Sequence, residues 1–151
     1  PAIDRTRIVV SGSSQGGGLA LAVAGLSTDV TVLFADVPFL SDIRRAIQVT
    51  DEHPYAELVG YLSVRRTEEQ AAFATLDYVD GVNFAVRATA SALFSVGLMD
   101  LICPPSTVFA AFNHYGGPKR ISVWPYNGHE GGGVQHTIER AELLRSTWPE
   151  G

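Results

Sequence analysis

Residues 7–25 read RIVVSGSSQGGGLALAVAG, and this stretch decides the class of fold. The apolar run 7–10 has the composition of a buried strand, and residues 11–16 form a turn of small side chains. Residues 18–25 are rich in alanine and leucine and end at a glycine, which is typical of a helix. A strand, a tight turn and a helix in this order begin a β-α-β unit. We therefore expect residues 7–10 to be buried on both faces of a parallel sheet.

The same alternation of strand and helix patterns occurs further along the chain. Three more apolar or β-branched runs predict strands over residues 30–35, 92–96 and 121–124. A helix is predicted after each of the last two, over residues 108–114, entered through prolines, and over residues 134–148. The predicted fold is therefore α/β, with a mostly parallel sheet flanked by helices.

Residues 37–86 interrupt this alternation, because they contain several helical patterns and no strand-like run. The best-marked helix start is Thr-Glu-Glu-Gln at residues 67–70, whose spacing matches a capping box. We expect a helical excursion at the carboxyl edge of the sheet, where it would shape the mouth of a site. Its apolar residues Phe73, Leu76 and Val79 are expected to pack on one sheet face.

Composition excludes several classes of protein. The 151 residues are expected to form a single domain, and the net charge of −5 comes with scattered basic residues, so nucleic acid is not an expected partner. Cys103 is the only cysteine and cannot form an internal disulfide, which makes a reducing cytoplasm the expected location. No apolar run reaches the roughly 18 residues of a membrane span, so no membrane is expected as a partner.

The turn after the first predicted strand contains Gly12-Ser13-Ser14-Gln15-Gly16, a G-x-S-x-G pattern centred on Ser14. This pattern places a serine on a strained strand-to-helix turn, with its hydroxyl exposed at the edge of the sheet. Ser13 does not fit, because its flanking positions are not glycines. A phosphate cradle is the alternative, but the turn lacks the lysine of a P-loop and does not match G-x-G-x-x-G.

A serine nucleophile needs a base to take its proton, and the base needs a carboxylate to hold its tautomer. In this kind of sheet the partners follow later strands, in the order Ser, Asp, His. Asp100 follows the third predicted strand and His129 follows the fourth. We therefore predict a triad in which Ser14 is the nucleophile, Asp100 the orienting acid and His129 the base.

Other aspartates and histidines compete less well for these roles. Asp36 follows the second predicted strand and is the main alternative to Asp100. The weaker candidates lie inside the helical excursion or inside predicted helices: Asp77, Asp80, His53, His114 and His136.

The oxyanion formed during acyl transfer needs about two hydrogen-bond donors, and the backbone N–H of Gln15 is the predicted first one. The second donor normally comes from a loop after an earlier strand, and the sequence has no such strand before residue 7. Met99 is the only methionine, so Pro1 is not a translation start. We therefore expect this chain to be the C-terminal half of a fold whose N-terminal half is missing.

Five motifs closely resemble the acetyl xylan esterase and cephalosporin C deacetylase family of α/β-hydrolases. They are GSSQGGGLAL at 12–21, DVPFL at 36–40, YVDGVNFA at 78–85, GLMDLICPPST at 97–107 and YNGHEGG at 126–132. Prolyl-oligopeptidase-like peptidases share the elbow but usually carry tyrosine where Gln15 stands. Dienelactone hydrolases use cysteine in place of Ser14.

The resemblance implies the same triad, Ser14, Asp100 and His129, and hydrolysis of acetyl esters on carbohydrates or cephalosporin-type compounds. It implies no metal or organic cofactor, an intracellular location and assembly into homo-hexamers. Two departures are visible. Ser13 replaces a more usual glycine, and the N-terminal half of the family fold is missing, together with the tyrosine whose N–H completes the oxyanion hole.

Two functional hypotheses follow from these residues. The first is a serine esterase that hydrolyses short-chain acyl esters through an acyl-enzyme. The second is a catalytically incomplete, hydrolase-like fragment that acts as an interaction or assembly module. The triad favours the first for the whole protein, and the missing half favours the second for this chain alone.

Overall fold

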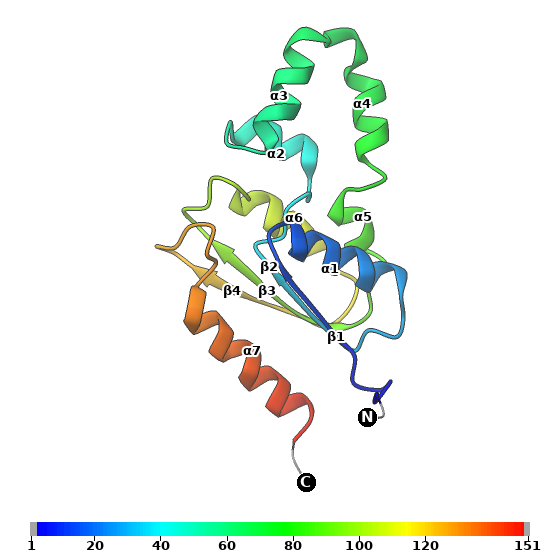
Figure 1. Cartoon of the computed structure of the whole chain (residues 1–151), viewed down its shortest axis with the longest axis vertical. Helices are drawn as coiled ribbons and strands as arrows, with labels where there is room; N and C mark the ends of the chain where they lie inside the picture. The colour runs from blue at the N-terminus through cyan, green and yellow to red at the C-terminus, as the bar shows by residue number, and fades with distance from the viewer. Residues whose placement is uncertain (1–2, 150–151) are drawn as a thin grey trace.

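A four-stranded parallel sheet forms the centre of the molecule (Figure 1). The computed structural model describes residues 3–149, and within them the strands lie side by side in sequence order. They are β1 (Val9–Ser13), β2 (Val32–Asp36), β3 (Ser91–Gly97) and β4 (Lys119–Trp124). All three neighbouring pairs run parallel, which confirms the predicted α/β class and mostly parallel sheet.

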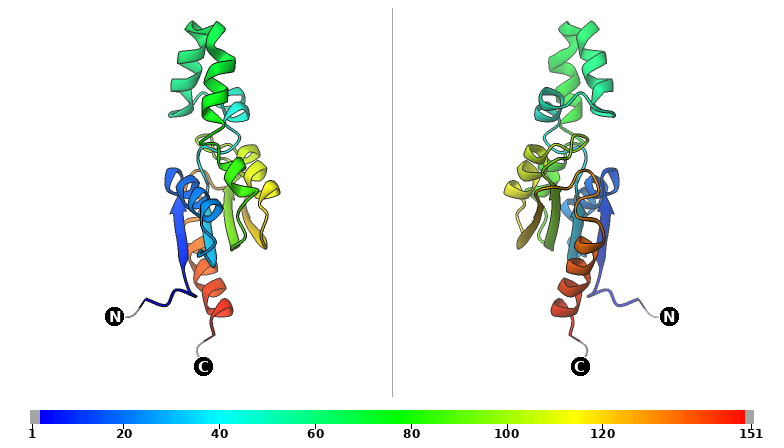
Figure 2. Two further views of the ribbon diagram at one scale, coloured as in Figure 1. Left: turned by 90° about the vertical axis from the view of Figure 1, so that its right-hand side faces the viewer. Right: turned by 90° about the vertical axis from the view of Figure 1, so that its left-hand side faces the viewer.

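Helices cover both faces of the sheet (Figures 1 and 2). One face carries α1 (Gln15–Leu26), α5 (Gly81–Ala85) and α6 (Pro105–His114), and the other carries α7 (Gly133–Thr147). Successive side chains of a strand point to opposite faces, so β2 serves both layers. Leu33 and Ala35 pack in the α1 layer, whereas Val32 and Phe34 pack against α7. None of the helices within residues 3–149 has the length and hydropathy needed to cross a membrane.

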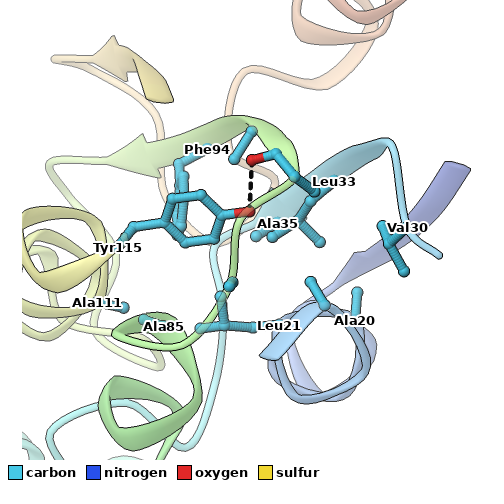
Figure 3. Close-up of a cluster of buried hydrophobic side chains, with 13 residues drawn as sticks. Ala20, Leu21, Val30, Leu33, Ala35, Ala85, Phe94, Ala111 and Tyr115 are labelled. Carbon is cyan, nitrogen blue, oxygen red and sulfur yellow. Dashed lines mark hydrogen bonds between the residues drawn. The ribbon is translucent and has the colours of Figure 1, made fainter. Parts of the chain in front are cut away.

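Alanines and two aromatic rings fill the larger core layer (Figure 3). Small residues on α1, α5 and α6 let these helices approach the sheet closely. Phe94 and Tyr115 meet edge to face, with ring centroids 5.5 Å apart. The Tyr115 hydroxyl donates a hydrogen bond of 2.8 Å to the carbonyl of Ala90, so this polar group is not left unpaired in an apolar layer.

The first strand differs from its prediction. It begins at Val9, continues through Ser13 into the predicted turn, and alternates between exposed and half-buried residues. Within the described residues β1 pairs only with β2, so its outer edge is open, and the expected burial on both faces is wrong. Helix α1 also starts at Gln15, three residues before its predicted start, because the turn is only one residue long.

The excursion over residues 37–86 is helical, as predicted, and much of it forms an arm that projects away from the sheet (Figures 1 and 2). The arm consists of α2 (Ile43–Val49), α3 (Tyr55–Val64), the 3₁₀ turn η1 (Arg66–Glu68) and α4 (Glu69–Leu76). Some of its apolar residues pack into a cluster at the base of the arm, with Ile43, Ala46 and Tyr55 buried at the centre.

Two expectations about the arm are wrong. Leu76 packs on the cluster inside the arm, Phe73 lies under the guanidinium of Arg44, and Val79 is half exposed, so none of these residues packs on the sheet. The capping box is also absent. Thr67 lies inside η1, and the N-cap of α4 is Glu68, which makes no side-chain capping bond. A 3₁₀ turn already continues into α4 at this point, so no free helix start remains to be capped.

Asp80 ties the two ends of the arm together. Its buried carboxylate accepts hydrogen bonds from the backbone N–H groups of Asp42 (2.9 Å) and Ile43 (2.8 Å), where α2 starts. It also accepts a 2.9 Å bond from the N–H of Val82 at the start of α5. One side chain therefore closes a loop of about forty residues, which explains an aspartate here without a catalytic role.

Removing this carboxylate is expected to loosen the whole arm. Asp80→Ala leaves three N–H groups without their partner, and each buried unpaired group costs about 1–3 kcal/mol. We expect the free energy of unfolding in urea to fall by about 3 kcal/mol. Asp77→Ala is the matched control, because Asp77 is exposed, and it should change little. Equal effects of the two variants would contradict this role for Asp80.

The open edge of β1 leads to a second expectation. Its unpaired backbone groups lie beside α1, which exposes Leu19, Val23 and Leu26 along one stripe. Such an edge is a template for pairing with another chain. We therefore expect a protein of residues 1–151 to self-associate, as measured by light scattering.

A double variant should reverse this association. Leu19→Lys with Leu26→Lys places charges on the stripe and should shift the protein towards monomer. Val64→Lys, at a position 80% exposed on the arm, is the control and should leave association unchanged. A monomeric parent protein at micromolar concentration would refute the expectation.

Candidate active site

Ser14 occupies a strained position between β1 and α1. Its backbone angles, φ 55° and ψ −120°, lie outside the usual regions for a residue with a side chain, a conformation that costs about 1–3 kcal/mol. Three backbone hydrogen bonds hold it there. The N–H of Ser14 donates to the carbonyl of Asp36 at 2.9 Å, and its own carbonyl accepts from Phe39 at 2.9 Å and Gly18 at 3.0 Å.

The two glycines of the G-x-S-x-G motif have different functions. A Cβ atom on Gly12 would lie 2.1 Å from the carbonyl oxygen of Gly16, so only glycine lets the strand and the first turn of α1 approach this closely. A Cβ atom on Gly16 would meet nothing within 4 Å. Gly12 is therefore required by the turn that presents Ser14, and Gly16 is not required sterically.

This difference gives a matched pair of variants. Gly12→Ala must force the backbone apart, and overpacking of this kind costs about 1–3 kcal/mol. We expect a corresponding fall in the free energy of unfolding, measured in urea, together with loss of any reactivity of Ser14. Gly16→Ala should keep both, because alanine is the better helix former. An equally damaging Gly16→Ala would disprove the assignment.

A chain of hydrogen bonds connects the three predicted triad residues. The hydroxyl of Ser14 lies 2.9 Å from Nε2 of His129, and Nδ1 of His129 lies 2.9 Å from Oδ2 of Asp100. These distances fit a nucleophile, a base and an orienting carboxylate. The structure thus brings together, at the carboxyl edge of the sheet, residues up to 115 positions apart in sequence.

The orientation of Asp100 is fixed by the loop that carries it. The residue is 2% exposed, and its Oδ1 accepts hydrogen bonds from the N–H groups of Ile102 (2.8 Å) and Cys103 (2.9 Å). Oδ2 is thereby left to face His129. Because a carboxylate only accepts hydrogen bonds, Nδ1 of His129 must carry the proton, and Nε2 of the neutral ring is the atom that can accept one from Ser14.

The loops that carry Asp100 and His129 brace each other. The N–H of Met99 donates to the carbonyl of Asn127 at 3.0 Å. A Cβ atom on Gly97 would lie 2.1 Å from the carbonyl oxygen of Gly128, so the backbones pass in direct contact. The separation between Asp100 and His129 is thus set by backbone contacts as well as by their own hydrogen bond.

Glu130 orders the loop of His129 from the solvent side. Its carboxylate accepts hydrogen bonds from Nδ2 of Asn127 (2.7 Å) and from the N–H of Gly128 (3.0 Å). The bond from Asn127, aided by backbone N–H groups, lowers the pKa of Glu130 below its ordinary value. No role for Glu130 was predicted from the sequence, and its position one residue after His129 was the available signal.

The competing candidates lie elsewhere or make other contacts. Asp36 pairs with His136 and Arg140 of α7 and not with His129. His53 and His114 are exposed, in the arm and in α6 respectively. The pairing of Asp36 with His136 was missed by sequence reasoning, because the two residues are 100 positions apart.

Cys103 is the only cysteine in the chain, and it lies beside the triad. Its sulfur, one nitrogen of His129 and one carboxylate oxygen of Asp100 lie within 4.8 Å of one another, a spacing that a metal ion could bridge. Burial, followed by the negative charge of Asp100, raises the pKa of the Cys103 thiol to about 12. Two of these three residues already bind each other through the 2.9 Å hydrogen bond between Nδ1 of His129 and Oδ2 of Asp100, so the cluster fits a triad with a buried thiol behind it.

Gln15 is the first residue of α1, and its side chain is exposed. The N–H at this position has no carbonyl partner within the helix and lies at the positive end of the helix dipole. This N–H, which directly follows Ser14, is the predicted first oxyanion donor. It would stabilise negative charge that develops beside Ser14.

The acetyl xylan esterase (AXE1) family model matches residues 1–146. The chain belongs to this family. It is 33% identical, over 132 residues, to an acetyl esterase from Xylanibacter ruminicola, covering 85% of this chain and 28% of that protein. The suspected family resemblance is therefore confirmed for acetyl xylan esterases.

Solved structures agree with this membership. An acetyl xylan esterase from a Paenibacillus species superposes with a TM-score of 0.92 at 38% identity, and one from a Thermoanaerobacterium species with 0.88 at 39% identity. Each comparison covers 95% of this chain and 46% of the other, so the chain spans less than half the length of these relatives. An acylaminoacyl peptidase from Pyrococcus horikoshii, with a TM-score of 0.71 at 15% identity, shares the α/β-hydrolase fold alone.

Proposed function

We propose that the protein is a serine esterase that hydrolyses short-chain acetyl esters of carbohydrates. The observation that carries the proposal is the continuous hydrogen-bond chain from Ser14 through His129 to Asp100. Family membership supports the substrate class, because the matching relatives are named as acetyl and acetyl xylan esterases. Cephalosporin-type acetyl esters are a second substrate class to test.

The proposed reaction starts at the hydroxyl of Ser14. As Oγ attacks the acyl carbon, its proton passes to Nε2 of His129, and the protonated ring is stabilised by Asp100. His129 then gives this proton to the leaving alcohol, which departs as the acetyl-enzyme forms. Water attacks the acetyl-enzyme with His129 as base again, releasing acetate and restoring Ser14.

Stabilisation of the oxyanion is proposed to come first from the N–H of Gln15. We expect a second donor from a loop after a strand that precedes residue 7 in the whole fold. The triad supplies both nucleophile and base, so the proposed reaction requires no metal or organic cofactor. Assembly into a homo-oligomer is also proposed.

The second candidate function concerns this chain by itself. The open edge of β1 and the short span relative to the solved esterases favour an interaction fragment with negligible esterase activity. Loss of one oxyanion donor alone costs about 10²–10³ in turnover. Labelling by a fluorophosphonate distinguishes the two functions, because only an activated Ser14 reacts readily.

A pair of serine variants in the full-length protein tests the main proposal. Ser14→Ala removes the nucleophile and should lower kcat for p-nitrophenyl acetate by about 10⁴-fold or more, with little change in binding. Ser13→Ala is the control, because Ser13 is exposed and lies next to the elbow without belonging to the triad. Near-normal hydrolysis by Ser14→Ala would overturn the assignment.

A further inference from the structure

A second polar cluster lies on the α7 side of the sheet, outside the proposed triad. The buried carboxylate of Asp36 at the end of β2 accepts one hydrogen bond from Nε2 of His136 and one from Nη1 of Arg140, each 2.8 Å long. Both partners belong to α7, and His136 is 3% exposed. Buried charged pairs of this kind are costly to break from one side.

The backbone of Asp36 holds the strained serine. Its carbonyl accepts the 2.9 Å hydrogen bond from the N–H of Ser14, and the next residue, Val37, also has a positive φ of 39°. The N–H of Val37 donates to the carbonyl of Ser95 on β3 at 3.1 Å. Ser14 and Val37 thus both have strained backbones, and both lie next to the carbonyl of Asp36. Such conformations persist only where the surroundings fix them, and the side chain of Asp36 holds this part of the backbone from the α7 side.

The other end of the cluster reaches the loop of His129. The ring of His136 meets Trp124 edge to face at 6.3 Å. A Cβ atom on Gly132 would lie 2.1 Å from the Trp124 ring, and one on Gly131 would lie 2.9 Å from Val37. The loop that carries His129 is therefore packed against Trp124, which His136 contacts, and against the residue that follows Asp36.

Arg140 adds a link to β1. Its second guanidinium nitrogen, Nη2, donates to the hydroxyl of Ser11, and the group lies 4.8 Å from the centre of the Phe34 ring. One helix thus holds the strand that leads into Ser14 and the strand whose carbonyl receives the Ser14 N–H. The same helix follows directly from the His129 loop.

We propose that Asp36 and His136 are positioning residues that set the distance between Ser14 and His129. This inference rests on the proposed esterase function. The contact between β2 and α7 fixes the elbow on one side and the loop of the base on the other. Without this contact, Ser14 and His129 each keep their local hydrogen bonds, but the distance between them is no longer fixed.

The geometry indicates which replacement can preserve the contact. The carboxylate of Asp36 can only accept, so Nε2 of His136 carries the hydrogen. Nδ1 of His136 is buried without a hydrogen-bond partner among residues 3–149 and lies 3.8 Å from the carboxylate of Glu139. Position 136 therefore requires one hydrogen-bond donor to Asp36, and the side-chain amide of glutamine can supply it from a similar distance along the side chain.

The experiment compares His136→Ala, His136→Gln and Glu142→Gln in the full-length protein. His136→Ala should lower kcat for p-nitrophenyl acetate, and the rate of fluorophosphonate labelling at Ser14, by between about 10-fold and 10²-fold, because small misplacements of reacting groups have such effects. KM should change less than threefold. His136→Gln should recover most of both rates. Glu142→Gln, exposed on the same helix, should match the parent.

Rates are normalised to the folded fraction, measured by circular dichroism at the assay temperature. The inference fails if His136→Ala keeps kcat and the labelling rate within twofold of the parent, or if His136→Gln is no better than His136→Ala. A Ser14→Ala variant in the same series separates the two claims. If Ser14→Ala is inactive while His136→Ala is normal, only the positioning role is wrong. If Ser14→Ala is active, the proposed esterase site is wrong.

Asp36→Asn provides an independent variant on the other side of the contact. It keeps the backbone carbonyl that receives the Ser14 N–H but loses the charge that faces Arg140. We expect a fall in kcat smaller than that of Asp100→Asn, in which the carboxylate that faces His129 is lost. A larger fall for Asp36→Asn would contradict a positioning role and favour Asp36 as the acid.

Discussion

The hydrogen bond from the N–H of Ser14 to the carbonyl of Asp36 is the constraint on which the site depends. Ser14 adopts a conformation that an isolated chain would avoid, and in that conformation its hydroxyl lies 2.9 Å from Nε2 of His129. The strain persists because β1 and β2 are parallel and in register, which brings Ser13 opposite Asp36. The sheet therefore stabilises the elbow directly, and the glycine at position 12 only makes room for it.

The rest of the site follows from the direction of the strands. In a parallel sheet every carboxyl end lies at the same edge, so loops after different strands converge there. Asp100 and His129 belong to two such loops, which are joined through their backbones and leave the imidazole of His129 between Asp100 and Ser14. Convergence gives only approximate positions, and close backbone contacts such as that of Gly97 with Gly128 set the final ones.

The direction of the strands can be predicted from the sequence, whereas contacts between residues far apart in the chain cannot. The order of strands and helices and the three triad candidates follow from local patterns and from the parallel-sheet rule. The partners of Asp36 do not, because α7 lies 100 residues away and nothing local distinguishes His136 from an ordinary helical residue. The burial of residues 7–10 was overestimated for a similar reason. An apolar run indicates a strand, but only the neighbouring strands decide whether it is buried.

Asp36 and Asp100 show how position separates two similar residues. Each follows apolar strand residues at the same sheet edge, so sequence alone leaves both as candidates for the acid. Asp36 is still inside β2, on the face shared by Val32 and Phe34, and strand alternation turns it towards α7. Asp100 lies three residues beyond β3, where the backbone has left the sheet and two N–H groups of its own loop orient the carboxylate. Three residues of extra chain thus separate a carboxylate that supports the sheet edge from one that faces the imidazole.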